Sequence, residues 1–182
     1  MLLTTSRRPT GRIRTFCHDL ANSISDVVRV NRGKMSMDGV AEKAIELDAD
    51  RVIIVDRWHG GPGKIGFFQV SSNGLEPIPP LMLINSIRLR RELTEARKGT
   101  RASALTLEPE DSSELKKAAA HLSKYFGLPV MPIDEASKNH RASLHFSFDS
   151  SRHIQATFIL LHRMVEIGPR VTLSELVWDG QS

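Results

Sequence analysis

The sequence predicts an α/β fold made of two similar halves, each with a β-α-β unit and a mixed sheet. Three observations favour it. A short apolar run near the N-terminus is followed by apolar residues at helical spacing. The continuous β-branched run Val52–Val55 is typical of a strand buried on both faces. After residue 101 the strand-then-helix pattern begins again.

Elements of the first half follow from local signals. Leu2–Thr5 is a predicted strand, and Pro9 favours a helix start because the N–H that proline lacks has no intrahelical partner there. This helix has one apolar face: Ile13, Phe16, Cys17, Leu20, Ala21 and Ile24. Val27–Val30 is the next predicted strand, and Ser36 can cap a second helix. The later strands are Val52–Val55, Ile65–Val70 and Leu81–Ile84, with a hairpin turn at Gly60–Gly63.

In the second half, Ala104–Leu107 is a predicted strand, and Asp111 with Glu114 has the spacing of a helix capping box. Gly127 ends that helix. The remaining predicted strands are Leu144–Phe148, Gln155–Leu161 and Val171–Val177. A constant offset of 102 aligns the start of this half with the first, Leu3 with Leu105 for example. We therefore expect one domain over residues 1–182, with halves 1–86 and 102–182 joined by the basic segment 87–101. The alternative is that any two β-α-β units align after some sliding.

Composition limits the class of protein. The chain has 182 residues, 40% of them hydrophobic and 25% charged, which is an ordinary globular composition. Its one cysteine, Cys17, allows no internal disulfide and fits a reducing cytoplasm. No apolar run approaches the ~18 residues of a membrane span. Because Met1–Thr5 runs directly into Ser6-Arg7-Arg8, the start lacks the order of a signal peptide, and we expect a cytoplasmic protein with no membrane partner.

Basic charge is concentrated in two stretches. The net charge is +4, yet residues 1–34 carry seven Lys and Arg against two acids, and residues 86–101 carry six against two. In a β-α-β unit the loops after parallel strands lie along one edge of the sheet, where anionic ligands often bind. The residues predicted to contact RNA at this edge are Ser6, Arg7, Arg8, Arg12, Arg29, Arg32, Lys34, Arg57 and Trp58. Trp58 is interpreted first as a packing residue, and second as a stacking surface for an unpaired base.

Other patterns give weaker signals. A possible second patch comprises Arg88, Arg90, Arg91 and Arg170, although residues 88–91 read equally as a polar linker. Gly60-Gly61-Pro62-Gly63-Lys64 lacks the Ser or Thr and the helix that follow a phosphate-binding loop lysine. The spacing of the histidines is not that of metal ligands. The acidic pair Asp134-Glu135 is predicted to lie in a solvated loop. Cys17 is predicted to be a buried thiol of the core. We predict no catalytic residue, no metal and no cofactor.

Four strings carry a resemblance to a known family: LLTTSRRPTGRIRTFCHDL (2–20), RVNRGKMS (29–36), ADRVIIVDRWHGGPGKIGF (49–67) and EIGPRVTL (166–173). Together they resemble the Brix-domain ribosome biogenesis proteins in their compact archaeal form. The resemblance implies a fold of two halves similar to anticodon-binding domains, with no catalytic activity. It also implies binding of rRNA or pre-rRNA, and association with small guide RNA ribonucleoproteins and other assembly proteins.

The leading hypothesis is therefore a non-catalytic factor that binds pre-rRNA through the basic edge of its N-terminal half and assists rRNA processing and subunit assembly. One alternative is a protein–protein scaffold whose basic loops dock an acidic partner in a pre-ribosomal complex. Another is an α/β enzyme that binds a phosphorylated substrate at the same edge, although the sequence offers no acid or base for it.

Overall fold

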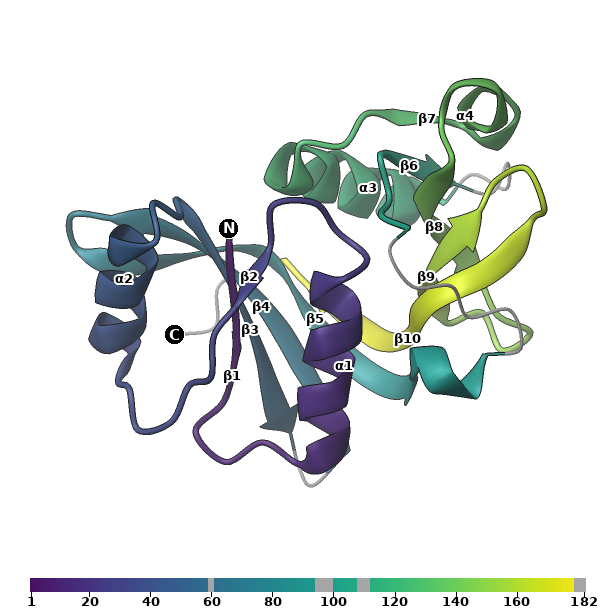
Figure 1. Cartoon of the computed structure of the whole chain (residues 1–182). Helices are drawn as coiled ribbons and strands as arrows, with labels where there is room; N and C mark the ends of the chain where they lie inside the picture. The colour runs from purple at the N-terminus through teal and green to yellow at the C-terminus, as the bar shows by residue number, and fades with distance from the viewer. Residues whose placement is uncertain (59–60, 94–99, 108–111, 179–182) are drawn as a thin grey trace.

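The computed structural model describes residues 1–58, 61–93, 100–107 and 112–178, and only the backbone of Trp58, Gly61 and Pro62 (Figure 1). The first half contains β1 (Leu2–Thr5), α1 (Gly11–Ala21), β2 (Val28–Arg29), α2 (Met37–Glu46), β3 (Arg51–Trp58), β4 (Gly61–Ser71) and β5 (Gly74–Arg88). A single 3-10 turn, η1 (Arg90–Glu92), follows β5. The second half contains β6 (Ala104–Leu107), α3 (Ser113–Phe126), β7 (Val130–Pro132), α4 (Ile133–Asn139), β8 (Ala142–Phe148), β9 (Ile154–Leu160) and β10 (Val165–Val177).

All ten strands form one mixed sheet in the order β2-β1-β3-β4-β5-β10-β9-β8-β6-β7. The strands at each end pair in parallel, β1 with β2 and β3, and β6 with β7 and β8. The pairs between them are antiparallel. Each half has the same order of elements and of neighbouring strands, and β5 and β10 meet at the centre. The predicted α/β class is confirmed; that the halves are duplicated copies stays a prediction.

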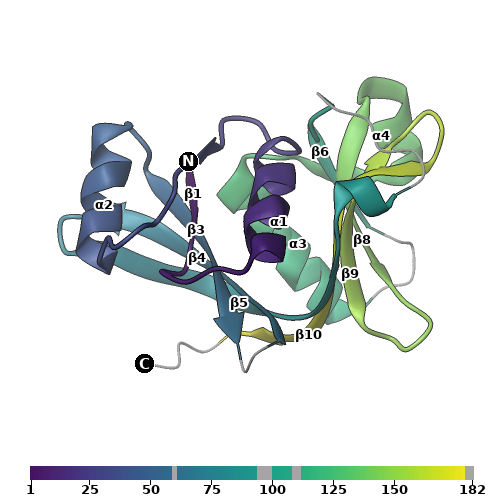
Figure 2. The same ribbon diagram turned by 60° about the horizontal axis from the view of Figure 1, so that its bottom comes forward.

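The helices divide between the two faces of the sheet. Helices α1 and α3 contribute to one large core, in which Phe16, Leu122 and Phe146 are almost fully buried. Helix α2 packs in a second cluster at one end of the sheet, and α4 in a third cluster at the other. Figure 2 shows α1 and α3 near the centre, with α2 and α4 toward opposite ends. On the face opposite α1 and α3, α2 therefore reaches only part of β4 and the start of β5, near Val70 and Leu75.

Capping explains where the helices begin. Thr10 and Ser36 are the N-caps of α1 and α2, and their hydroxyls accept hydrogen bonds from Ile13 N and Gly39 N at 3.2 and 3.0 Å. The prediction for Ser36 is confirmed, whereas α1 begins two residues after Pro9. The N-cap of α3 is Ser112, so the predicted capping role of Asp111, which itself lies outside the described residues, is wrong. Gly127 ends α3 at φ 68°, as predicted.

Contacts between helix α3 and the strands of the first half join the two halves. The Tyr125 hydroxyl on α3 donates a hydrogen bond to the Val52 carbonyl of β3 at 2.8 Å, and its ring meets Phe67 edge-on at 4.9 Å between centroids. Burial raises the pKa of Tyr125 above its ordinary value. On α1, Cys17 is fully buried and its pKa is raised to about 12, mainly by burial. Cys17 is therefore a core thiol, in agreement with the sequence.

Strands β4 and β10 begin earlier than predicted, at Gly61 and Val165, and two further segments differ from the sequence prediction. Strand β5 spans Gly74–Arg88, whereas only Leu81–Ile84 was predicted, because Pro77, Pro79 and Pro80 read as strand breakers. Asp134 and Glu135 lie in the first turn of α4, where carboxylates favour the helix dipole, and not in a loop. Neither difference alters the edge on which the predicted site lies.

Candidate nucleic-acid interface

The carboxyl ends of β1, β2 and β3 lie next to one another because these strands are parallel neighbours. Backbone hydrogen bonds confirm the contact: Ser6 N donates to Val55 O at 3.0 Å, and Val30 N donates to Leu3 O at 2.9 Å. The loops that follow carry most of the predicted binding residues. We call this set the basic rim: Ser6, Arg7, Arg8, Arg29, Arg32, Lys34 and Arg57.

Two arginines of the basic rim converge on one carbonyl. Arg7 Nε and Arg32 Nε both donate to Met35 O, at 3.3 and 2.8 Å. Arg32 is only 7% exposed. Burial lowers its pKa, as does the neighbouring charge of Arg7, while Asp56 acts in the opposite direction. Arg32 is therefore buried beside Arg7 and held by the same carbonyl, and no local pattern predicts that this loop residue points inward.

The remaining cations of the basic rim face solvent. Arg8, Arg29, Lys34 and Arg57 are exposed. Arg29 Nη1 donates to Asn31 Oδ1 at 2.9 Å, a neutral partner. Among the described residues, no carboxylate lies within ion-pair distance of Arg7, Arg8 or Lys34. The positive charge of the basic rim is thus available to an external anion.

A groove of about 720 Å³ opens beside the basic rim. Ser6, Arg7 and Arg32 line its polar part, together with Asp56 and Lys64, which the sequence analysis did not single out. The Ser6 hydroxyl is buried without a hydrogen-bond partner in the described structure. The groove also has an apolar wall formed by Ile54, Phe67, Phe68, Ile78, Leu81 and Val177. Its residues come from strands far apart in sequence, so no local pattern predicts it. The side chain of Trp58 lies outside the described residues.

Arg12 does not join the basic rim, and its predicted position there is wrong. Its guanidinium makes two hydrogen bonds to the Glu92 carboxylate, at 2.6 and 2.9 Å, and a third to Ile87 O at 2.6 Å. These partners lie in β5 and η1, far along the chain. Helical periodicity places Arg12 on the solvent side of α1 but cannot predict such a partner.

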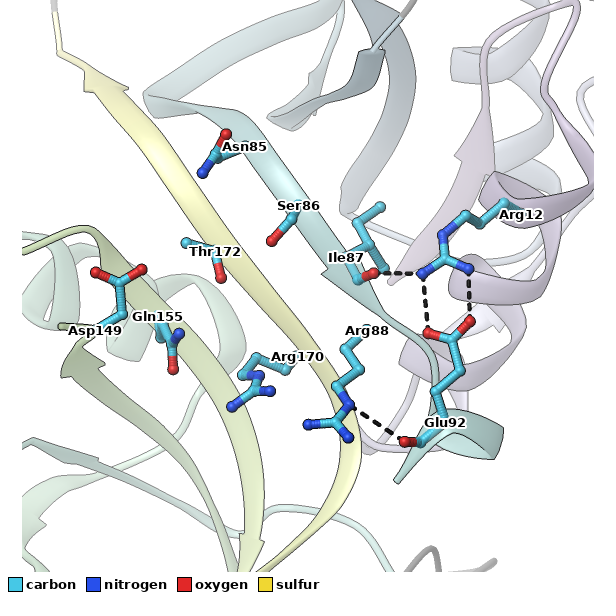
Figure 3. A pocket seen from close by; sticks show the side chains of 10 residues that line it. All are labelled: Arg12, Asn85, Ser86, Ile87, Arg88, Glu92, Asp149, Gln155, Arg170 and Thr172. Carbon is cyan, nitrogen blue, oxygen red and sulfur yellow. Dashed lines mark hydrogen bonds and ion pairs between the residues drawn. The ribbon is translucent and has the colours of Figure 1, made fainter. Parts of the chain in front are cut away.

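The predicted second patch is only partly formed. Arg88 of β5 and Arg170 of β10 are directly opposed in the sheet. Together with Arg12 they line a pocket of about 460 Å³, the central cleft (Figure 3). Arg91 is exposed on η1. Arg90 is 7% exposed and donates to Ser23 Oγ at 2.7 Å, so a binding role for it is not supported.

The Arg12–Glu92 pair gives a pH prediction. Hydrogen bonds from Arg12 and from Leu89 N hold the pKa of Glu92 near 2, below its ordinary 4.5. A lowered carboxyl pKa adds stability above about pH 4.5, and this is lost as the pH falls toward 2. We expect Glu92→Gln to be less stable than the wild type at neutral pH, and the difference to shrink below pH 4.5. Urea unfolding at several pH values measures this, and a difference independent of pH would contradict it.

The described residues contain neither a membrane-spanning helix nor a cluster of metal-ligating side chains. No helix there is long and apolar enough to cross a membrane. No group of three or more His, Cys, Asp or Glu side chains in those ranges is arranged to hold a metal ion.

Comparison with known proteins places the chain among archaeal proteins. No protein-family model matches the sequence. A probable Brix domain-containing ribosomal biogenesis protein of Aeropyrum pernix is 37% identical over 90 residues, which is 50% of each chain. The protein of the same name from Thermococcus kodakarensis is 36% identical over 93 residues, 51% of this chain and 44% of the relative. These matches thus span about half the length of the curated relatives.

The fold is similar over nearly the whole chain. The crystal structure of a probable ribosomal biogenesis protein from Aeropyrum pernix has a TM-score of 0.74 and 28% identity, and the match covers 97% of both chains. The family resemblance inferred from the sequence is therefore confirmed.

Proposed function

We propose that this chain, a relative of the archaeal Brix-domain ribosomal biogenesis proteins, takes part in ribosome biogenesis as a non-catalytic RNA-binding protein. It would bind rRNA or pre-rRNA through the basic rim and assist rRNA processing and subunit assembly. The names of its relatives support the assembly role. The arrangement of the basic rim supports RNA as the ligand.

One observation carries the proposal: cations from three chain segments gather at one sheet edge, and among the described residues no carboxylate lies within ion-pair distance of Arg7, Arg8 or Lys34. Arg7 and Arg32 share a carbonyl acceptor, and Arg8 and Lys34 extend from the same two loops. A compact anion such as free phosphate would occupy one or two of these groups. A sugar–phosphate chain presents charge at regular intervals and can engage all of them.

The groove beside the basic rim favours single-stranded RNA over a duplex. Its apolar wall suits the flat face of an unpaired base, and Arg7 at its mouth suits the adjoining phosphate.

Charge reversal of the rim tests the proposal. We expect Arg7→Glu with Arg8→Glu to weaken binding to rRNA fragments in a filter assay. At ~0.7 per single-strand phosphate contact, the slope of log affinity against log salt should become shallower by about 1.4. The matched control is Lys124→Glu with Lys138→Glu, exposed lysines on α3 and α4 that make the same change in net charge.

The outcomes separate the candidate functions. If both double variants weaken binding equally, only general electrostatics is involved and the basic rim is not the site. If the wild type binds no RNA at moderate salt but retains an acidic partner protein from the assembly pathway, the scaffold function replaces RNA binding. The apolar wall and charged mouth of the groove would then hold a segment of that partner.

A further inference from the structure

Two arginines face each other at the centre of the sheet. Arg88 of β5 and Arg170 of β10 are direct partners in the antiparallel register. Their side chains lie on the same face because Ile87 and Val171, the adjacent register pair, both point into the large core on the other face. Like charges directly opposed on neighbouring strands destabilise a sheet. An anion bound between them would remove that repulsion.

Internal acids compensate these charges only in part. Arg170 Nη1 lies 3.2 Å from Glu166 Oε1, which also accepts a hydrogen bond from Thr157 Oγ1. Arg88 Nε donates to the backbone carbonyl of Glu92 at 3.2 Å. The Glu92 carboxylate itself is engaged by Arg12. In the described part of the chain, Arg88 therefore has no ion-pair partner, and its terminal nitrogens can reach a ligand.

The surroundings of the pair are open and rich in hydrogen-bonding groups. The central cleft of about 460 Å³ is also lined by Ser86, Thr172, Asn85 and Gln155, so hydroxyls and amides form its floor (Figure 3). Its second acid, Asp149, accepts hydrogen bonds from Ser151 N and His153 N, both at 2.8 Å. The carboxylates of Glu92 and Asp149 thus both have hydrogen-bond partners within the protein. Arg88 remains available to bind a ligand.

A shift in the strand register precedes Arg170, which lines the cleft. The register between β10 and β9 shifts between Glu166 and Arg170, where Gly168 and Pro169 stand. A bulge of this kind redirects the side chain that follows it. Helix α2 packs near Leu75 at the start of β5, and α4 packs against β6 and β7 toward the other end of the sheet, so both helices lie away from Arg88 and Arg170 (Figure 2).

From these observations we infer that the central cleft binds a phosphate group of RNA between Arg88 and Arg170. The inference rests on the proposed function, since it assigns a second contact to the same RNA. Planar guanidinium groups suit phosphate oxygens, and the hydroxyl and amide groups of the floor supply further hydrogen bonds. Strand β5 passes from the groove at Leu81 to the cleft at Asn85, ~13 Å at ~3.3 Å per residue. One RNA strand can therefore reach both sites.

Neutral substitutions test the cleft. We expect Arg88→Gln to weaken binding of an oligouridine of about ten nucleotides about fivefold at ~0.1 M salt, with a slope shallower by ~0.7. Adding Arg170→Gln together with Glu166→Gln keeps the further change in net charge at zero and should weaken binding further, while the total change in slope stays near the ~0.7 of one phosphate contact. The control is Lys138→Gln, an exposed lysine on α4 outside the cleft, which should stay within about twofold. Thermal unfolding confirms that each variant is folded.

Further measurements separate this inference from the proposed function and from binding of free phosphate. If Arg7→Glu with Arg8→Glu weakens RNA binding while the cleft variants do not, the cleft inference is overturned and the function stands. If the wild type binds no RNA, both fail. Inorganic phosphate is titrated in parallel and followed by phosphorus NMR. Phosphate binding that the cleft variants abolish, without any change in RNA affinity, would overturn RNA as the ligand of the cleft.

Discussion

We expect Asp19→Ala to lower the free energy of unfolding by about 3 kcal/mol. Asp19, on α1, is 7% exposed, and its Oδ2 accepts a hydrogen bond from the backbone N of Arg90 at 2.9 Å. It is also the acid that favours the charged form of the buried Arg90 guanidinium, whose pKa burial otherwise lowers. The substitution removes the acceptor of a buried N–H and leaves a buried charge uncompensated. Urea denaturation measures the loss.

Two further variants separate these contributions. Asp19→Asn keeps an oxygen for the Arg90 N–H but removes the charge, so its cost should be intermediate. Arg90→Met in the Asp19→Ala background removes the uncompensated charge and should restore part of the stability. If Asp19→Ala lowers the free energy of unfolding by less than about 1 kcal/mol, the hydrogen bond from Arg90 N to Asp19 does not contribute the stability expected here.

Gly168→Ala should cost about 3 kcal/mol, because β10 crosses Phe158 without room for a methyl group. A Cβ at this position would lie 2.5 Å from Phe158 Cβ and 2.8 Å from two of its ring carbons. Phe158 is 4% exposed within the large core and cannot move aside. Thermal or urea unfolding measures the effect.

The controls for this substitution follow from the same geometry. Gly11→Ala, at the first position of α1 with nothing within 4 Å of the added atom, should be neutral or slightly stabilising. Phe158→Leu should not rescue Gly168→Ala, because leucine keeps the Cβ that makes the closest contact. Full stability of Gly168→Ala would show that the two strands pack less closely here.

Local sequence signals predict the first strand and two of the helix caps correctly. Strand β1 matches its predicted bounds, and Ser36 and Gly127 cap α2 and α3 as expected, because these features depend on nearby residues. Helix α4 was not predicted, since it has seven residues and only Ala136 of them is buried. The length of β5 was missed because tertiary pairing outweighed the usual effect of its prolines.

The candidate site was predicted at the level of segments but not of every side chain. Parallel pairing brings Arg7, Arg8 and Lys34 to one edge, and this follows from the β-α-β pattern. The burial of Arg32 and the pairing of Arg12 with Glu92 depend on contacts between distant segments, which periodicity does not contain. The same limit applies to the opposition of Arg88 and Arg170.

The pairing of β5 with β10 has a consequence for synthesis of the chain. Leu81 pairs with Val177, so the inner edge of the first half stays open until β10 has left the ribosome. An open edge with unpaired N–H and C=O groups can pair with other nascent chains. The N-terminal half therefore emerges with a vulnerable boundary, which is protected only after about 90 further residues, when β10 has been translated.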